Sequence, residues 1–196
     1  MNEIAQYFDA LADEWERSLN WPSPVQGAVA AIAGVGSGSR VLDLGCGTGI
    51  MAPVYLARNV SSVMALDVAP RMIEIAQEKY RDEPRLEFRC CDALEFEDEG
   101  GEGFDAVVVY NAYPHFLDKR ALAQKAARML KPGGRFVVAH SMSKEQLNQH
   151  HGNVPASVTS DLLPAAEEAK AWQDLFAIDS MVDAPGFYCF AGTVRL

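Results

Sequence analysis

The chain has 196 residues, of which 49% are hydrophobic and 22% are charged, and its formal net charge is −10. This composition excludes a disordered chain and predicts one globular domain over residues 1–196. So acidic a surface disfavours nucleic acid, because Lys and Arg are scattered rather than gathered in a patch. No apolar run approaches the ~20 residues of a membrane span. Residues 1–16 do not resemble a signal peptide, so we expect a cytoplasmic protein.

The N-terminal region is predicted to be helical. Apolar residues recur at helical spacing over residues 3–17. A second helix is expected over residues 25–33, followed by a glycine-containing turn at 34–39. Together these segments form an expected helical lid, residues 1–34.

Short apolar runs and helical patterns then alternate along the chain. The pattern predicts strands at 40–44, 62–66, 86–90, 104–110 and 135–139. Between them it predicts helices at 50–58, 71–80 and 119–130. A polar insert at 142–164, a helix at 165–174 and strands at 176–182 and 187–196 are expected to follow. Alternating strands and helices indicate a doubly wound, mostly parallel sheet covered by helices on both faces. The last two strands, separated by a turn sequence, predict a closing hairpin with one antiparallel strand. Ligands of such sheets bind beyond the carboxyl ends of the strands.

A glycine-rich segment, DLGCGTG at residues 43–49, follows the first predicted strand and precedes a helix. Glycines in this position allow a tight turn and a close approach of ligand to backbone. A dinucleotide site would require a glycine or alanine where Ile50 stands. Asp43 suits a cationic ligand better than a pyrophosphate. Asp67, at the end of the next strand, can accept hydrogen bonds from ribose hydroxyls.

These residues resemble the motifs of class I S-adenosylmethionine (SAM)-dependent methyltransferases. The resemblance covers most of the chain: DLGCGTG at 43–49, the acid Asp67, CDA around Asp92, FDAV at 104–107 and LKPGG at 130–134. It implies a Rossmann-like seven-stranded sheet with an antiparallel C-terminal strand. It also implies methyl transfer from SAM, which leaves S-adenosylhomocysteine (SAH) as product.

The resemblance further implies which residues bind the cofactor. Gly45 and Gly47 would face the methionine part, Asp67 the ribose and Asp92 the adenine amino group. Tyr7 and Trp15 resemble aromatic residues that the family's N-terminal helix folds over the cofactor, although packing of an amphipathic helix would explain them equally. The full predicted set is Tyr7, Trp15, Asp43, Gly45, Cys46, Gly47, Gly49, Asp67, Val68, Met72, Asp92, Ala93 and Asn111.

The histidines leave three alternatives open. His115 or His140 would serve as a general base for an acceptor that loses a proton. Alternatively His115, His140, His150 and His151 would bind a divalent transition metal, for which imidazole is a common ligand. In the third alternative they only pack or cap.

The methyl acceptor is expected to be a small molecule. The sequence Asn-Ala-Tyr-Pro at 111–114 departs from the Asn-Pro-Pro-Tyr motif typical of adenine and glutamine methyltransferases. The insert at 142–164, with the N-terminal helices, would build the acceptor pocket and close over it. The alternatives are a SAM-binding regulatory protein without transferase activity and a metal-assisted methyltransferase. The sequence does not indicate an oligomeric state.

Overall fold

The computed structural model describes residues 2–18 and 23–195 and contains one seven-stranded sheet. Its order is β3-β2-β1-β4-β5-β7-β6. β7 is antiparallel to both β5 and β6, and the other described pairs are parallel. The strands are β1 (Arg40–Leu44), β2 (Ser62–Asp67), β3 (Leu86–Cys90), β4 (Phe104–Tyr110), β5 (Leu130–His140), β6 (Phe176–Ala184) and β7 (Phe187–Val194). The predicted fold class, including the antiparallel C-terminal strand, is confirmed.

Helices cover both faces of the sheet, and two apolar cores lie beneath them. One core joins α2 (Pro24–Ile32), α3 (Ala52–Ala57) and α4 (Pro70–Lys79) to one face. The other joins α5 (Lys119–Met129) and α7 (Ala165–Glu168) to the opposite face. Side chains alternate between the two faces along each strand, so that Val41 belongs to the first core and Leu42 to the second.

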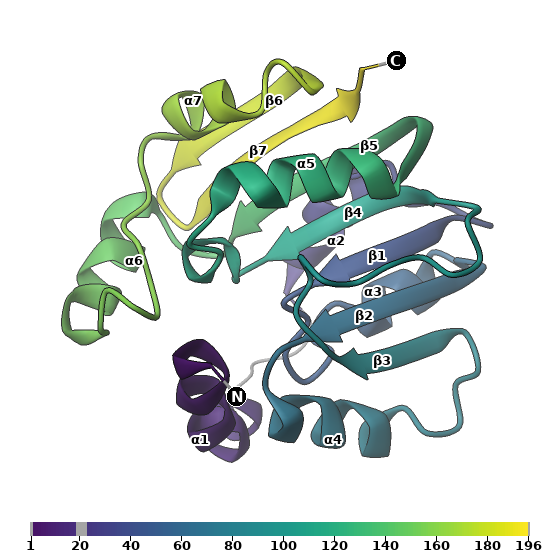
Figure 1. Cartoon of the computed structure of the whole chain (residues 1–196), viewed down its shortest axis with the longest axis horizontal. Helices are drawn as coiled ribbons and strands as arrows, with labels where there is room; N and C mark the ends of the chain where they lie inside the picture. The colour runs from purple at the N-terminus through teal and green to yellow at the C-terminus, as the bar shows by residue number, and fades with distance from the viewer. Residues whose placement is uncertain (1, 19–22, 196) are drawn as a thin grey trace.

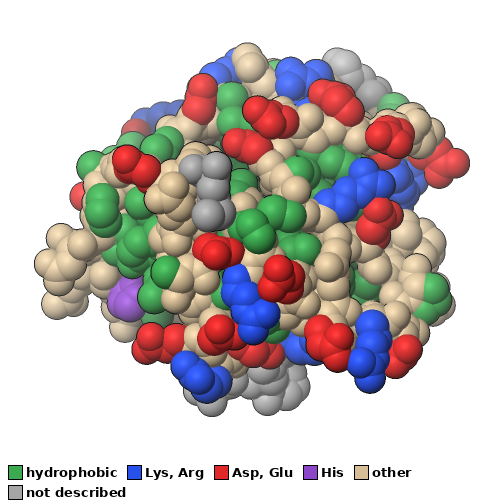
Figure 2. All heavy atoms as spheres, turned by 60° about the horizontal axis from the view of Figure 1, so that its bottom comes forward, with side chains coloured by type: hydrophobic (Ala, Val, Ile, Leu, Met, Phe, Trp, Pro, Cys, Tyr) green, Lys and Arg blue, Asp and Glu red, His purple; other side chains and the backbone are tan. Residues whose placement is uncertain are grey.

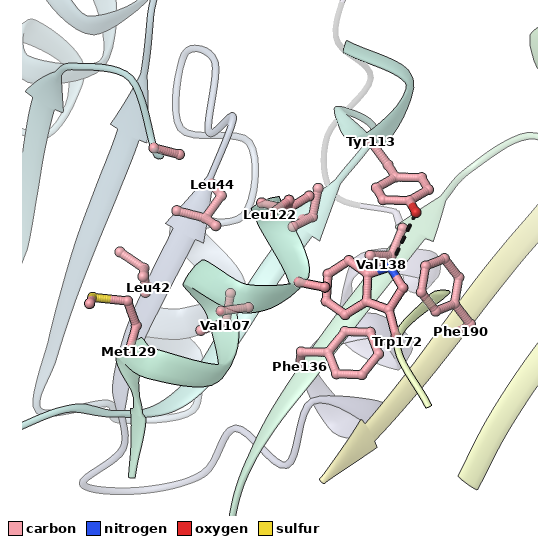
Figure 3. Close-up of a cluster of buried hydrophobic side chains, with 14 of the residues drawn as sticks. Leu42, Leu44, Val107, Tyr113, Leu122, Met129, Phe136, Val138, Trp172 and Phe190 are labelled. Atoms are coloured by element: carbon pink, nitrogen blue, oxygen red, sulfur yellow. Dashed lines mark hydrogen bonds between the residues drawn. The ribbon is translucent and has the colours of Figure 1, made fainter. Parts of the chain in front are cut away.

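A buried polar network runs through the second core. The Trp172 indole donates to the Tyr113 hydroxyl at 3.2 Å, which donates to Glu168 at 3.1 Å. Figure 3 shows the Trp172–Tyr113 bond among the apolar side chains that pack on α5. Lys119 and the Leu163 amide also donate to Glu168. This network connects the region after β5 to the segment after β4. Each buried polar group in it has a hydrogen-bond partner, as buried polar groups generally require.

α1 (Glu3–Ser18) and α6 (Lys144–His150) lie at the carboxyl edge of the parallel strands (Figure 1). The predicted insert is therefore not irregular throughout. Ser143 and Gln146 form a capping box that starts α6, a signal overlooked in the polar sequence around it. The predicted boundary of β5 was also wrong, because the strand begins at Leu130 and continues to His140. Short 3-10 turns are η1 (Tyr113–His115), η2 (His151–Asn153) and η3 (Ala169–Ala171).

The predicted 165–174 helix is shorter in the structure, where α7 ends at Glu168 and η3 follows. Part of the predicted lid, residues 1 and 19–22, and residue 196 of the last strand lie outside the described residues. The division of the chain into lid and insert stays a prediction. On the face shown in Figure 2, Lys and Arg are interspersed with Asp and Glu.

Candidate active site

A cavity of about 260 Å³ opens at the carboxyl edge, where the strand order reverses between β1 and β4. This is the position at which doubly wound sheets bind ligands. Its walls come from the loops after β1, β2, β3 and β4 and from α1. The lining includes Phe8, Trp15, Gly45, Cys46, Gly47, Ile50, Asp67, Val68, Met72, Cys91, Asp92, Ala93, Asn111, Ala112, His115 and Phe116. We call it the loop cavity.

The glycine-rich loop forms the floor of the loop cavity. The amides of Gly45 and Cys46 both donate to the Leu66 carbonyl, at 2.8 and 3.0 Å. Gly45 has φ +72°, and a Cβ there would lie 2.5 Å from the Cβ of Ala112. At Gly47, where φ is +54°, a Cβ would make only ordinary contacts, 3.8 Å from the Trp15 ring nitrogen and 3.9 Å from the Met72 sulfur. Gly47 therefore brings the backbone to the cavity lining with no side chain in front of it.

Asp67 links the loop to the next strand. One carboxylate oxygen accepts from the Gly47 amide at 2.9 Å and the other from the Ala69 amide at 2.9 Å. Burial raises the pKa of Asp67, and these backbone hydrogen bonds oppose the shift. Each oxygen keeps a second acceptor position, because a carboxylate oxygen has two lone pairs. Asp67 can thus hold the loop and still accept bonds from a ligand.

Asp92 and Asn111 stand on the other walls. The Asp92 carboxylate accepts from the Leu94 amide at 2.9 Å, which fixes the turn after β3. Asn111 has φ +56° and is one of the non-glycine residues in the left-handed region. Its side chain accepts from the Ser141 amide and donates to the Ser141 hydroxyl, so it joins the ends of β4 and β5. Strained conformations of this kind cluster at functional sites.

The structure brings most of the predicted cofactor set to the loop cavity, with three exceptions. Asp43 and Gly49 do not line it, and Tyr7 lines a neighbouring cavity instead. Asp43 is 3% exposed, and burial raises its pKa to about 7, while the nearby Tyr55 hydroxyl opposes the shift. A Cβ on Gly49 would lie 2.8 Å from Tyr80, so this glycine is needed for packing behind the loop. Both residues support the loop from beneath.

α1 covers the loop cavity with Phe8 and Trp15. Its position is fixed by α4, which begins without a capping side chain of its own at Ala69. Asp9 of α1 supplies that cap by accepting from the Arg71 amide at 2.7 Å. Ion pairs from Arg71 to Asp13 and from Lys79 to Glu16 join the same two helices. The covering helix is therefore tied to the helix that follows Asp67.

A second cavity, of about 130 Å³, lies between α1 and the α6–η2 region. We call it the histidine cavity. It shares Phe8, Trp15, Asn111 and His115 with the loop cavity, so the two meet at these side chains. Its remaining lining is Tyr7, Leu11, Ser141, Met142, Leu147, His150, His151 and Val154.

His115 stands at the junction of the two cavities. Its Nδ1 donates to the Val158 carbonyl at 2.9 Å, and its ring packs edge-on against Phe8 at a centroid distance of 4.6 Å. Burial lowers the pKa of His115 to about 4; the bond to Val158 opposes this shift and His151 adds to it. The imidazole is therefore neutral near pH 7, with the proton on Nδ1 and a lone pair on Nε2. That state is the one required of a general base.

His140 does not join this group, which corrects its prediction as a catalytic residue. It is 1% exposed, lies on the face of β5 that carries Phe136 and Val138, and packs against Tyr188. Neither ring nitrogen has a hydrogen-bond partner within residues 2–18 and 23–195. The sequence placed it at the rim because the strand was expected to end at Ala139.

The predicted metal site is not supported. Within the described part of the chain, no group of three or more His, Cys, Asp or Glu side chains is arranged to hold a metal ion. His140 is buried and lines neither cavity, and the His151 Nδ1 is occupied by a hydrogen bond with Thr159 at 3.0 Å. The ring centroids of His115 and His151 are 5.1 Å apart.

Sequence reasoning missed several residues of the site. Phe8 lines both cavities, and Ser141 binds the Asn111 side chain. The helical periodicity of residues 3–17 marked Phe8 as inward-facing, but only the docking of α1 shows what it faces. Cys91 and Ile50 flank predicted residues and could have been found from their neighbours.

The seven-stranded sheet with an antiparallel β7 has the Rossmann-like topology of class I methyltransferases. Residues 41–134 match the family model described as a methyltransferase domain, which confirms the resemblance to class I SAM-dependent methyltransferases. Among curated proteins, the chain is 32% identical over 131 residues to the human mitochondrial ubiquinone biosynthesis O-methyltransferase, covering 65% of this chain and 35% of that protein. It is 30% identical over 139 residues to the ubiquinone biosynthesis O-methyltransferase of Xanthomonas oryzae, covering 67% and 58%.

Solved structures confirm the fold at low sequence identity. A Haloferax volcanii protein solved with the Trm112 methyltransferase activator superposes with a TM-score of 0.77 at 22% identity, covering 100% and 99% of the two chains. The Bradyrhizobium japonicum N-methyltransferase NodS, solved with SAH, gives 0.76 at 16% identity and full coverage of both. None of the helices in residues 2–18 and 23–195 is long and apolar enough to cross a membrane.

Proposed function

We propose that this chain binds SAM in the loop cavity and transfers its methyl group to a small-molecule acceptor. The observation that carries the proposal is the position of Asp67, partly buried at the cavity wall and bonded to the Gly47 amide of the glycine-rich loop. The motif order of the sequence and the methyltransferase relatives support it. The SAH bound to NodS supports the choice of ligand.

The residues present fit SAM. The cavity beside Gly47 suits the methionine part, the free lone pairs of Asp67 suit the ribose hydroxyls, and Asp92 suits the adenine amino group. Asp43 lies beneath the loop, and in its ionised form it favours a cationic ligand without touching it. Trp15 and Met72 would close over the ligand from α1 and α4.

An oxygen atom is the proposed acceptor. The chain spans between 35% and 58% of the length of the ubiquinone biosynthesis O-methyltransferases cited above. Their names favour transfer to oxygen over transfer to nitrogen. His115, whose Nε2 is free to accept a proton, suits an acceptor that loses one.

The chain's own contribution to the reaction is positioning. SAM supplies a methyl group on a sulfonium, which is open to in-line displacement. The protein holds donor and acceptor in adjoining cavities, excludes water with α1, and keeps a neutral imidazole at the junction. Such positioning contributes the larger share of the rate enhancement when little acid–base chemistry is required.

Transfer of a tritiated methyl group from SAM to a panel of phenols, amines and thiols tests the proposal. We expect label in at least one small-molecule product and an equal amount of SAH. Binding of SAM without any transfer would instead indicate a regulatory SAM-binding protein. Absence of SAM binding would overturn the proposal.

A further inference from the structure

We propose that the histidine cavity is the methyl-acceptor subsite, and that it takes an uncharged aromatic ring whose hydroxyl faces Nε2 of His115. The inference rests on the proposed function, because it names the substrate class of the adjoining site. It concerns the residues from α1, α6 and η2, which the methyltransferase motifs do not cover.

The walls of the histidine cavity are largely aromatic and aliphatic, with three histidines among them. Tyr7, Phe8 and Trp15 line it from α1, and Leu147 and Val154 line it from α6 and the segment after η2. In the described chain, none of the lining side chains is Asp, Glu, Lys or Arg. A charged acceptor would lose its hydration there without gaining a counter-charge, at a cost of several kcal/mol (on the order of 2–7 even for a neutral polar group). The lining therefore selects a neutral, largely apolar molecule.

The cavity's volume matches one ring. Its 130 Å³ is close to that of an apolar protein cavity of roughly 150 Å³ that binds benzene. Flat rings prefer edge-on or offset contacts with other rings, and the lining supplies them on one side. A long or branched acceptor would require α1 or α6 to move.

Residues 158–160 of the insert orient the proposed base. The Val158 carbonyl holds the proton of His115 on Nδ1, and Thr159 bonds Nδ1 of His151. The Ser160 amide and hydroxyl both donate to the Pro114 carbonyl, at 2.9 and 3.2 Å. The insert is thus fastened along η1, and the tautomer of His115 depends on that contact.

The proposed step balances. The acceptor oxygen forms a bond to the methyl carbon as the carbon–sulfur bond breaks, and the electron pair of that bond stays on sulfur. The hydroxyl proton passes to Nε2 of His115 and then to solvent. An ether oxygen that still carries its proton is a much stronger acid than imidazolium. A weakly basic imidazole that is neutral before the step is therefore sufficient to take the proton late in the step and to release it to solvent afterwards.

Two variants separate the subsite from the SAM site. Val154→Trp fills the histidine cavity, and Ala156→Trp is its matched control, because Ala156 is exposed in the same insert and lines neither cavity. His115→Asn keeps an N–H where Nδ1 meets Val158 but removes the group at Nε2.

The probes are phenol, catechol, aniline, benzylamine and benzoate. Each is titrated calorimetrically into SAH-saturated protein and tested as a methyl acceptor.

We expect phenol or catechol to bind SAH-saturated protein and to be methylated, while benzylamine and benzoate do neither. Val154→Trp should weaken phenol binding at least tenfold and leave SAH affinity within twofold, and Ala156→Trp should change neither. His115→Asn should lower kcat for phenol by about 10²-fold or more with little change in phenol binding.

Methylation of only the charged probes, unchanged phenol binding in Val154→Trp, or undiminished kcat in His115→Asn would overturn the inference. If SAH itself does not bind, the proposed function has failed and not this inference alone.

Discussion

His115 and His140 are the same residue type in two different environments. His115 has a partner for one nitrogen and a cavity before the other, whereas His140 has neither. The pKa of His140 is lowered to about 3, mainly by burial and to a smaller extent by the positive charges of His115, His151 and Lys119. Tyr188 is the ring packed against it. His140 is therefore a neutral core residue, and its effect should be seen in stability.

Acid should destabilise the protein through His140. The unfolded chain takes up a proton near the ordinary histidine pKa of about 6.5, but the folded chain does so only near 3. The unfolded state thus binds more protons between these values, and the free energy of unfolding falls as pH falls from about 6.5, by up to ~1.4 kcal/mol per pH unit for one group.

In His140→Leu this contribution disappears, and two unpartnered nitrogens are removed from the core. At pH 7 the free energy of unfolding should be unchanged or higher by about 1 kcal/mol. Urea denaturation between pH 4.5 and 7 checks both points. The interpretation fails if the variant loses stability on acidification as steeply as the parent.

At the scale of elements, the docking of α1 on α4 decides whether the loop cavity is covered. The Asp9 cap contributes more than the Arg71–Asp13 ion pair, because that pair is largely exposed and exposed pairs contribute little. Proline at the start of α4 leaves the Arg71 amide as a donor that needs an acceptor.

Asp9→Ala should lower the free energy of unfolding by about 1 kcal/mol, the usual cost of a lost N-cap. Asp13→Ala serves as the matched control, because it removes an equal charge from the same helix and breaks only an exposed pair. Thermal and urea unfolding of both variants give the comparison. Equal losses in the two would show that Asp9 acts through charge alone and not as a cap.

For the whole molecule, local patterns predicted the sheet and the glycine-rich loop well. The loop's glycines, Asp67 and Asp92 follow directly on strands, so their positions at the carboxyl edge depend only on the sheet being parallel. The predicted role of His140 was wrong because β5 continues one residue further than expected, to His140. Side chains alternate along a strand, so the His140 ring lies on the core-facing side with Phe136 and Val138. The grouping of Phe8, His115 and Val154 could not be predicted, since it depends on how α1 and the insert pack.

The central claim is that the loop cavity binds SAM through Asp67. Calorimetric titration of SAH into the parent protein and into Asp67→Ala tests it most directly, with Asp82→Ala as a control that removes an exposed carboxylate. We expect binding with a Kd of about micromolar order in the parent and in Asp82→Ala, and loss of nearly all binding in Asp67→Ala, provided that its unfolding remains cooperative. Unchanged SAH affinity in a folded Asp67→Ala, or no binding to the parent protein, would contradict the claim.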